Sequence, residues 1–485
     1  MRLEDSALLR TQAYVDGQWI DADSGGTSAV TNPANGATLA EIARCGTAET
    51  RRAIEAAERA LPAWRARTAK DRAGLLRKLF DLMMAHQEDL AKIMTAEQGK
   101  PLAESRGEIA YGANFIEWFA EEAKRVYGDT IPGPSPDKRI VCIKQPVGVV
   151  GCITPWNFPN AMLTRKIAPA LASGCTVVCK PANATPLSAF AIAELAHRAG
   201  IPAGVINILA GNTAEIGAEL TGNPIVRKVT FTGSTEVGKQ LIQECAATVK
   251  RTSMELGGNA PFIVFDDADL AAAVAGAMAS KYRNAGQTCV CANRMLVQAG
   301  VYDAFAEKLT AAVRKLVVGD GMDQKTTVGP LIDRKAADSV IAMIDDAVTR
   351  GGRVAIGGKR AANGEAFVEP TVITGVTREM RVFREEIFGP VAPLVRFETE
   401  AEAIEMANDT EFGLAAYFYS RDVGRIWRVA EGLDYGIVGI NEGLISNEAA
   451  PFGGMKESGN GREGSKYGMD EYLEIKYLCL GGIDR

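Results

Sequence analysis

Histidine is almost absent from this chain, which has 485 residues and only two histidines, His86 and His197. A Ser-His-Asp or Cys-His hydrolase needs a histidine as its general base, and zinc sites usually need histidine or paired Cys-x-x-Cys ligands. Both histidines fall in segments that we expect to be helical, 81–95 and 186–199, where a surface or structural role is the ordinary one. The scarcity argues against both kinds of site, and we expect no metal. A nucleophilic cysteine here would need a carboxylate or water as its base.

Blocks of basic residues and long apolar runs are also missing. Lys and Arg total 54 against 60 for Asp and Glu, so the net charge is −6, and we expect no nucleic-acid partner. No apolar run approaches the roughly 20 residues of a membrane span, and the first residues lack the layout of a signal peptide. Nine cysteines over this length form no disulfide pattern. These absences predict a cytoplasmic protein with no membrane partner.

Strand-like and helix-like segments alternate from residue 146 onward. The strands are expected at 147–153, 175–179, 205–209 and 227–231, and the helices at 160–172, 186–199, 213–221 and 234–247. This alternation predicts an α/β fold with a parallel sheet covered by helices on both faces. Ligands bind at the carboxyl ends of such strands. Those ends carry Thr154-Pro-Trp-Asn157, Lys180-Pro-Ala-Asn183, Gly211-Asn212 and Thr232-Gly-Ser234.

The chain before this region reads differently. Residues 14–41 suggest short strands with turns, and helical periodicity follows at 47–63, 68–98 and 101–125. Thr47 and Thr68 each precede a helical run and are expected to cap it. Residues 126–144 form a pair of short strands interrupted by Pro and Gly, which we interpret as an arm projecting from a domain.

One turn carries the most chemical interest. Asn284-Ala-Gly-Gln-Thr-Cys289-Val-Cys291 lies between an expected helix at 270–282 and an expected strand at 294–298. Backbone N–H groups beside a thiol on such a turn can lower its pKa and later hold an oxyanion. Most free cysteines are buried and small, so we expect the others to be core or incidental residues.

Two glycine-rich motifs invite a nucleotide-binding interpretation. Gly459-Asn-Gly-Arg-Glu-Gly464 has the G-x-G-x-x-G spacing but follows no expected strand, so we treat it as a chance match. Gly233-Ser-Thr-Glu-Val-Gly-Lys239 nearly fits a phosphate-binding loop, and 262–267 mimics the acidic strand of a triphosphatase. Gln240 replaces the hydroxyl that would hold Mg²⁺, which argues against that class of enzyme. Ser234 at a helix start can still meet a pyrophosphate.

Six motifs occur together and in order: Pro155-Trp-Asn-Phe-Pro159, Lys180-Pro-Ala182, Phe231-Thr-Gly-Ser234, Glu255-Leu-Gly-Gly258, Gly286-Gln-Thr-Cys289 and Glu386-Ile-Phe-Gly-Pro390. With them the chain, from about residue 14 to 480, resembles the NAD(P)-dependent aldehyde dehydrogenase superfamily. The resemblance implies a Rossmann-like cofactor domain (1–125 and 145–255), an α/β catalytic domain (256–455) and a β arm (126–144 and 456–485). An apolar strand near 472–480 would leave an exposed edge in a monomer, so we expect a homo-oligomer, dimer or tetramer.

The resemblance also implies catalytic roles. Cys289 would attack an aldehyde carbon, and the Asn157 amide with the Cys289 backbone N–H would hold the oxyanion. Glu255 would act as general base for the thiol and for the water that hydrolyses the thioester. This intact set argues against a catalytically silent member of the family.

The cofactor site follows from the same resemblance. The residues expected to line it are Ile153, Thr154, Pro155, Trp156, Lys180, Ala182, Asn183, Gly217, Gly233, Ser234, Leu256, Glu386 and Phe388. Relatives specific for NAD often carry Glu at the position of Asn183, where a carboxylate would repel a 2′-phosphate. Neutral Asn183 predicts that NADP is accepted as well as NAD.

Three positions bear on the substrate. Arg165, Arg283 and Ser446 lie in segments that resemble the succinate-semialdehyde dehydrogenase branch, in which two arginines and a serine hold the far carboxylate. A guanidinium suits that partner. We predict oxidation of succinate semialdehyde, with glutarate semialdehyde or another short ω-carboxy aldehyde as the alternative. Cys291 could form a reversible disulfide with Cys289, although a buried structural thiol is an equal interpretation.

Overall fold

The predicted alternation of strands and helices forms an eight-stranded sheet. The computed structural model describes residues 2–483. Five strands in the middle of this sheet are parallel, as expected, and antiparallel strands lie at both edges. Its order is β19 (Gly459–Asn460), β11 (Arg251–Glu255), β10 (Val226–Thr232), β7 (Val149–Ile153), β8 (Thr176–Lys180), β9 (Ile206–Ile208), β1 (Ala13–Val15) and β2 (Gln18–Ile20).

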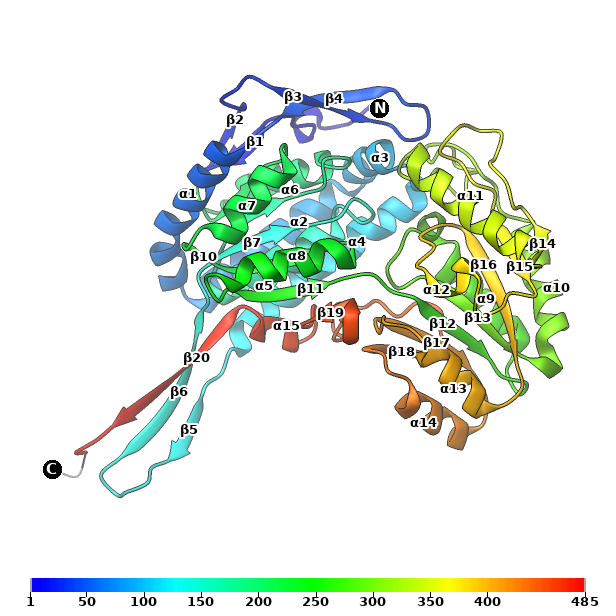
Figure 1. The fold of residues 1–485 in the computed structure, drawn as a ribbon. Helices are drawn as coiled ribbons and strands as arrows, with labels where there is room; N and C mark the ends of the chain where they lie inside the picture. The colour runs from blue at the N-terminus through cyan, green and yellow to red at the C-terminus, as the bar shows by residue number, and fades with distance from the viewer. Residues whose placement is uncertain (1, 484–485) are drawn as a thin grey trace.

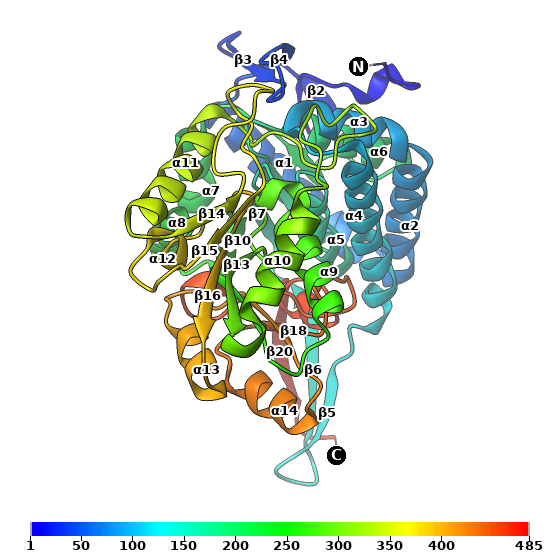
Figure 2. The same cartoon turned by 90° about the vertical axis from the view of Figure 1, so that its right-hand side faces the viewer.

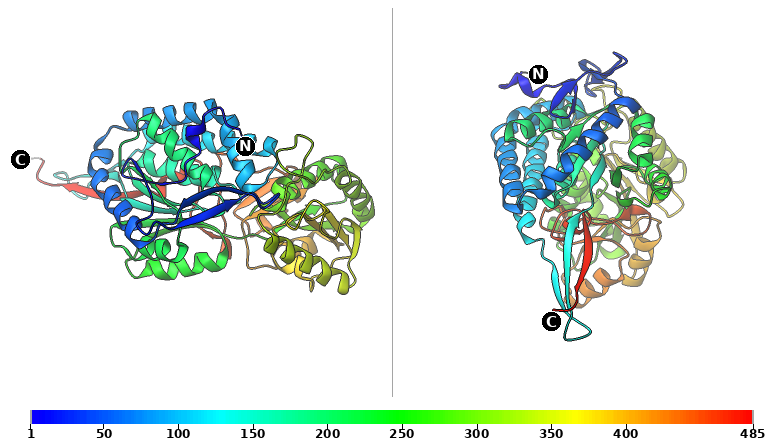
Figure 3. Two further views of the ribbon diagram at one scale, coloured as in Figure 1. Left: turned by 90° about the horizontal axis from the view of Figure 1, so that it is seen from above. Right: turned by 90° about the vertical axis from the view of Figure 1, so that its left-hand side faces the viewer.

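Helices cover both faces of this sheet, as Figure 1 and the view from above in Figure 3 show. An apolar core lies on each side of the sheet, and each helix buries its apolar stripe in one of these cores against the strands. One group consists of α1 (Thr47–Ala66), α7 (Thr213–Gly222) and α8 (Thr235–Ala246), and the other of α2 (Ala69–Ala85), α3 (Gln87–Gln98), α4 (Leu102–Glu122), α5 (Ala161–Ser173) and α6 (Leu187–Ala199).

Two helix predictions need correction. The single helix expected at 68–98 is broken at His86, whose backbone leaves the helical region and ends α2 before α3 begins. The break lets α3 pack against α4 and α6, a tertiary constraint that periodicity does not reveal. Thr47 is not a cap: Gly46 holds that position, and its N–H donates to Glu49 at 2.8 Å. The Thr68 cap is confirmed, with its hydroxyl accepting from Asp71 N–H at 3.1 Å.

A second sheet of seven strands begins directly after the first. Six of its strands are parallel and β14 is antiparallel at one edge. Its order is β14 (Arg353–Ile356), β15 (Thr371–Thr374), β16 (Val391–Phe397), β13 (Ala292–Gln298), β12 (Ala260–Val264), β17 (Ala415–Tyr419) and β18 (Ile437–Ile440). It carries α9 (Leu270–Lys281), α10 (Tyr302–Val313), α11 (Arg334–Thr349), α12 (Arg381–Arg384), α13 (Glu400–Asn408) and α14 (Val423–Gly432). Figure 2 views this half of the molecule.

The expected arm is present as a three-stranded antiparallel sheet. Its order is β20 (Leu473–Leu480), β6 (Arg139–Pro146) and β5 (Asp129–Pro132), so β20 forms one edge. The arm extends away from the rest of the chain at the lower left of Figure 1. Ile475 and Tyr477 on β20 are 72% and 59% exposed. A further hairpin of β3 (Thr27–Thr31) and β4 (Thr38–Ala43) lies beside the N-terminal strands.

The domain boundaries remain a prediction. Within the stretch assigned to the arm, however, residues 459–470 lie against the first sheet. β19 pairs with β11, and α15 (Tyr467–Asp470) packs against α5. Residues 459–470 therefore contact the first sheet and its helices, and only β20 joins the arm. Across residues 2–483, no helix is both long enough and apolar enough to span a membrane.

Candidate active site

Cys289 lies on a braced turn between α9 and β13. Asn284 and Ala285 both have positive φ, 51° and 54°, which costs about 1–3 kcal/mol for each residue. The turn is held from two sides. Asn284 N–H donates to Glu104 on α4 at 2.8 Å, and a Cβ on Gly286 would lie 2.2 Å from the Gly389 carbonyl oxygen. The surrounding structure thus fixes the backbone that presents the thiol.

Asn157, at the end of the loop after β7, is held against this turn. Its Nδ2 donates to the Gln287 carbonyl at 3.0 Å, and its own carbonyl accepts from Lys100 Nζ at 2.7 Å and Asn284 Nδ2 at 3.0 Å. An amide nitrogen carries two hydrogens, so one remains for a ligand. Asn157 can therefore still donate one hydrogen bond to a ligand, which the predicted oxyanion-binding role requires.

Cys289 and Asn157 line one cavity of about 260 Å³ together with seven of the predicted cofactor residues. These seven are Pro155, Trp156, Gly233, Ser234, Leu256, Glu386 and Phe388, and Met162, Thr232 and Gly257 complete the lining. Trp156 and Phe388 meet edge to face with ring centroids 5.6 Å apart. The structure does not place the other predicted cofactor residues in this cavity. Ile153 and Lys180 are the last residues of β7 and β8, Thr154, Ala182 and Asn183 follow these strands, and Gly217 lies on α7.

The expectation that the turn lowers the Cys289 pKa is wrong for the resting protein. Burial raises the pKa of the thiol to about 12, and the positive charge of Arg165 offsets this only in part. The acidic residues Glu386 and Glu255 add to the increase. Because the thiol is neutral at rest, it must lose its proton to a base before it can act as a nucleophile.

Glu255 ends β11 and has a buried carboxyl group. Neither carboxyl oxygen has a hydrogen-bond partner among the described residues. Burial raises the pKa of Glu255 well above its ordinary value, and the neighbouring Glu463 carboxylate raises it further. A buried carboxyl with a raised pKa can accept a proton near neutral pH, as the predicted general base must.

Glu463 and Lys166 are site residues that the sequence analysis missed. Glu463 lies 2.6 Å from Lys166 Nζ and 2.9 Å from Arg165 Nε, and all three side chains are buried. The glycine-rich segment dismissed as a chance match positions Glu463. Gly459 pairs with Glu255 in the first sheet, and a Cβ on Gly459 would lie 1.8 Å from the Met254 carbonyl oxygen. The glycines of this segment, which no motif explained, were the sequence signal that could have drawn attention to Glu463.

The cavity and the neighbouring strand ends fit a dinucleotide. Lys180 Nζ is buried with one hydrogen bond, to the Pro181 carbonyl at 3.3 Å, so donors remain for ribose hydroxyls; burial lowers its pKa to about 8. Ser234 caps α8, and its helix start suits a pyrophosphate. Burial raises the pKa of Glu386 to about 8, and its carboxylate accepts from Gly258 N–H at 3.2 Å. When bound, a nicotinamide supplies the hydride acceptor.

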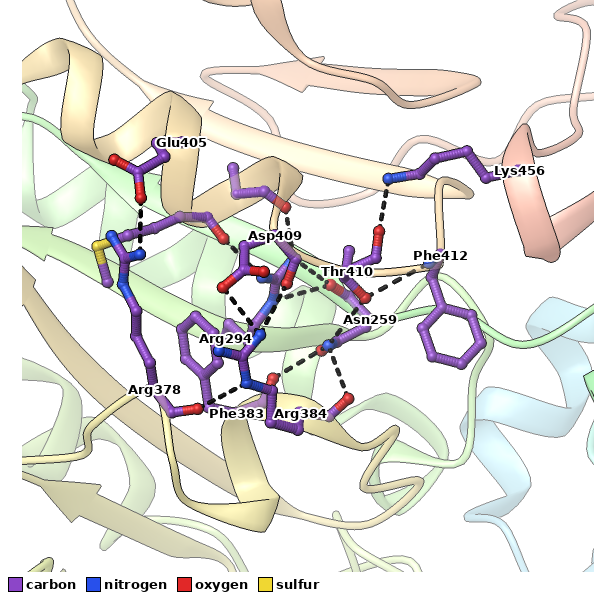
Figure 4. Close-up of polar contacts among 12 residues, drawn as sticks. Asn259, Arg294, Arg378, Phe383, Arg384, Glu405, Asp409, Thr410, Phe412 and Lys456 are labelled. Carbon is purple, nitrogen blue, oxygen red and sulfur yellow. Dashed lines mark hydrogen bonds and ion pairs between the residues drawn. The ribbon is translucent and has the colours of Figure 1, made fainter.

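A buried polar platform holds the loop that carries Glu386. Asn293 donates to the Glu385 carbonyl at 2.9 Å and accepts from Ile387 N–H at 3.0 Å. Asn293 also donates to Asn259, whose carbonyl accepts two hydrogen bonds from Arg294. Figure 4 shows Asn259 and Arg294 joined to the segments around Phe383 and Thr410. Removing any member would leave buried polar groups unpaired, at about 1–3 kcal/mol each.

Two of the three predicted substrate residues line a second cavity of about 250 Å³. Arg283 and Ser446 line it, together with Lys100, Glu104, Gly107, Glu108, Tyr111 and Phe158. Arg165 does not line it. Arg165 is buried between the rings of Phe115 and Phe452, at 5.3 and 4.0 Å, and its Nη2 has no acceptor among the described residues. Arg283 Nε also lacks one.

The proposed redox partner Cys291 is buried and directed away from solvent. Its thiol lies 3.5 Å from the Lys281 carbonyl and 3.6 Å from the Ala292 carbonyl, and burial raises its pKa. Cys289 and Cys291 are both free thiols here. A disulfide between them remains a prediction.

Comparison with known proteins defines the class. Residues 19–478 match the aldehyde dehydrogenase family, and the chain belongs to that family. It is 65% identical to the glutarate-semialdehyde dehydrogenase of Pseudomonas aeruginosa, with 100% of both chains covered. It is 63% identical to the NADP(+) succinate-semialdehyde dehydrogenase of Escherichia coli K12, covering 99% of this chain and 100% of the relative. The crystal structure of succinate-semialdehyde dehydrogenase from Burkholderia pseudomallei superimposes with a TM-score of 0.99 at 60% identity, covering 99% and 100% of the two chains.

Replacing Glu255 with glutamine tests the base. We expect Glu255→Gln to lower the steady-state rate about 10²- to 10⁴-fold while a thioester accumulates on Cys289, detectable by intact-protein mass spectrometry. The wild-type rate should rise with pH through the raised pKa of Glu255, because only the carboxylate accepts a proton. Glu255→Gln should lose this dependence. Glu365→Gln, an exposed carboxylate on the second half of the chain, is the control. An unchanged rate and pH profile in Glu255→Gln would exclude the assignment.

Proposed function

We propose that this protein oxidises succinate semialdehyde to succinate with NADP or NAD, through a thioester on Cys289. The observation that carries the substrate class is the set of buried, positively charged donors beside the catalytic turn. Arg165 and Arg283 each retain a buried N–H without an acceptor, and Arg283 lines the same cavity as Ser446. Buried donors of this kind cost free energy unless a ligand pairs with them, and a carboxylate offers the matching acceptors.

The chemistry uses the residues of the first cavity. The Cys289 thiol gives its proton to Glu255 through water or directly, and the sulfur bonds to the aldehyde carbon. The carbonyl oxygen becomes an oxyanion, which the free Asn157 N–H stabilises. A bound nicotinamide would accept the hydride that this carbon loses, and the carbon would then be held on Cys289 as a thioester. Glu255 first releases the proton of Cys289 to solvent and then takes a proton from a water molecule, which attacks the thioester. The acid leaves, and the Cys289 sulfur recovers a proton from Glu255.

Glutarate semialdehyde is the second candidate substrate. The Pseudomonas aeruginosa relative at 65% identity is named for it, while the Escherichia coli relative at 63% is named for succinate semialdehyde. The two aldehydes differ by one methylene, and an apolar pocket separates such a pair by only about 1–3 kcal/mol. Both substrates place a carboxylate opposite the aldehyde, so both are consistent with the same anion site.

The cofactor preference depends on Asn183. Its Nδ2 donates to the Gly211 carbonyl at 2.6 Å, and its Oδ1 accepts from Gly211 N–H at 3.2 Å. These bonds hold the side chain against the loop after β9. Because an asparagine side chain is neutral, no carboxylate at this position opposes a 2′-phosphate. The name of the Escherichia coli relative supports NADP as a cofactor.

The exposed apolar residues of β20 support a homo-oligomer. The outer edge of β20 has no partner strand among the described residues. Adding this edge to a sheet of a second copy would pair its N–H and C=O groups and bury Ile475 and Tyr477. The nine free cysteines also suit a reducing, cytoplasmic setting.

Substrate class is tested with three aldehydes: succinate semialdehyde, glutarate semialdehyde and butanal. We expect kcat/KM to favour the carboxylated aldehydes in the wild type. Arg283→Met should reduce that value about 10- to 150-fold for them, because it removes a charged hydrogen bond, and change butanal little. The exposed Arg421→Met is the matched control. A wild type that prefers butanal would overturn the substrate proposal but leave the cysteine chemistry intact.

Cofactor choice is tested at Asn183. Asn183→Glu should lower kcat/KM for NADP about 10-fold or more and affect NAD far less, because two negative charges would then face each other. Asn183→Gln keeps the amide and controls for the lost contacts to Gly211. Equal effects of Asn183→Glu on both cofactors would contradict this role.

Oligomerisation is tested on the arm. Ile475→Lys together with Tyr477→Glu should shift the protein to a smaller species in light scattering after gel filtration, because charges replace the apolar edge. Val249→Lys changes an exposed apolar residue away from the arm and should leave the mass unchanged. A wild-type monomer would exclude the proposed assembly.

A further inference from the structure

We infer that the hydroxyl of Tyr111 is a further donor in the carboxylate site and that it contributes to the choice of anionic over neutral aldehydes. This inference rests on the proposed function. Tyr111 belongs to α4, and neither its sequence position nor the six family motifs single it out. It lines the cavity of about 250 Å³ together with Arg283 and Ser446.

The ring and the hydroxyl of Tyr111 have different surroundings. The ring packs edge to face against Phe115, with centroids 5.0 Å apart, and contacts the apolar cluster of Phe158, Ala161 and Met162. The hydroxyl is buried and has no hydrogen-bond partner in good geometry among the described residues. Packing therefore fixes the ring, and the hydroxyl is directed to a place where an acceptor is missing.

Three buried donor groups share this deficit. Arg165 Nη2, Arg283 Nε and the Tyr111 hydroxyl all lack acceptors. Tyr111, Arg283 and Ser446 line one cavity, whereas Arg165 does not line it, although its positive charge acts on Tyr111 as that of Arg283 does. A carboxylate in this cavity has about four lone-pair sites on two oxygens and can accept from Tyr111, Arg283 and Ser446 together.

The chain's own carboxylates near this cavity are already engaged. Glu108 accepts from Lys100 Nζ and from Asn160 N–H, and Glu104 accepts from Asn284 N–H at 2.8 Å. Glu463, farther along, is paired with Lys166 and Arg165. A ligand can supply the missing acceptor, and a negative charge on it would also pair with the Arg283 guanidinium, which forms no ion pair among the described residues, whereas Arg165 is already paired with Glu463.

Tyr111 stays a neutral donor at physiological pH. Burial raises the pKa of its hydroxyl, and the charges of Arg165 and Arg283 oppose this increase without cancelling it. A neutral hydroxyl donates to a carboxylate, whereas a phenolate would repel it. A neutral aldehyde would leave the hydroxyl unpaired in a buried site, so Tyr111 disfavours such substrates as well as favouring anionic ones.

The test is Tyr111→Phe, which removes one oxygen and keeps the ring that packs on Phe115. We expect KM for succinate semialdehyde and glutarate semialdehyde to rise about 10- to 100-fold, with kcat changed less and kcat/KM for butanal within about threefold of wild type. Succinate, as a competitive inhibitor, should bind more weakly by a similar factor. Tyr302→Phe removes a buried hydroxyl bonded to the Leu394 carbonyl in the second sheet and is the matched control.

The outcomes separate this inference from the function on which it rests. If the wild type shows no preference for carboxylated aldehydes, the proposed function fails first. If the wild type shows it and Tyr111→Phe keeps the same KM and the same succinate inhibition, only the Tyr111 inference is overturned. An equal loss with butanal would mark a structural role and also overturn it. In a double-mutant cycle with Ser446→Ala, shared contact with one carboxylate predicts non-additive effects.

Discussion

The buried hydrogen bonds between Asn157, Asn284 and the Gln287 carbonyl join the two large sheets at the place where chemistry occurs. Asn157 comes from the first sheet and Asn284 from the turn before the second. Lys100, itself paired with Glu108, completes the network from a third segment. Because every bond lies in a buried site, losing one leaves an unpaired polar group, and the network resists small displacements. The position of the thiol relative to the oxyanion donor depends on it.

Burial also governs the reactivity of the site. The same exclusion of water that strengthens these hydrogen bonds raises the pKa of Cys289 and of Glu255. The positive charge of Arg165 opposes both increases in pKa. Arg165 itself is paired with the Glu463 carboxylate. The site is therefore a balanced set of buried charges, in which one negatively charged substrate group would change the balance. This links the carboxylate site to the reactivity of the thiol.

Several elements could be predicted because their causes are local. The alternation after residue 146 gave the order and type of β7 to β10 with their helices, and Thr68 was recognised as a cap from its side-chain type alone. The break at His86 could not be predicted, because the segment keeps its helical periodicity and only packing against α4 and α6 requires the turn. Glu463 escaped notice for a related reason: it lies far from Arg165 in the sequence.

By itself, the sequence determined the class of chemistry, since nucleophile, amide and carboxylate lie in short motifs whose residue types carry their meaning. Scarce histidine excluded the common alternatives. Only the tertiary structure decided the pKa of the catalytic thiol and which buried donors have hydrogen-bond partners. The turn of Cys289 suggested a lowered pKa, and burial reversed that expectation. Which donors lack acceptors is likewise a property of the folded chain, because Tyr111, Arg165 and Arg283 meet only after α4, α5 and the catalytic turn have packed together.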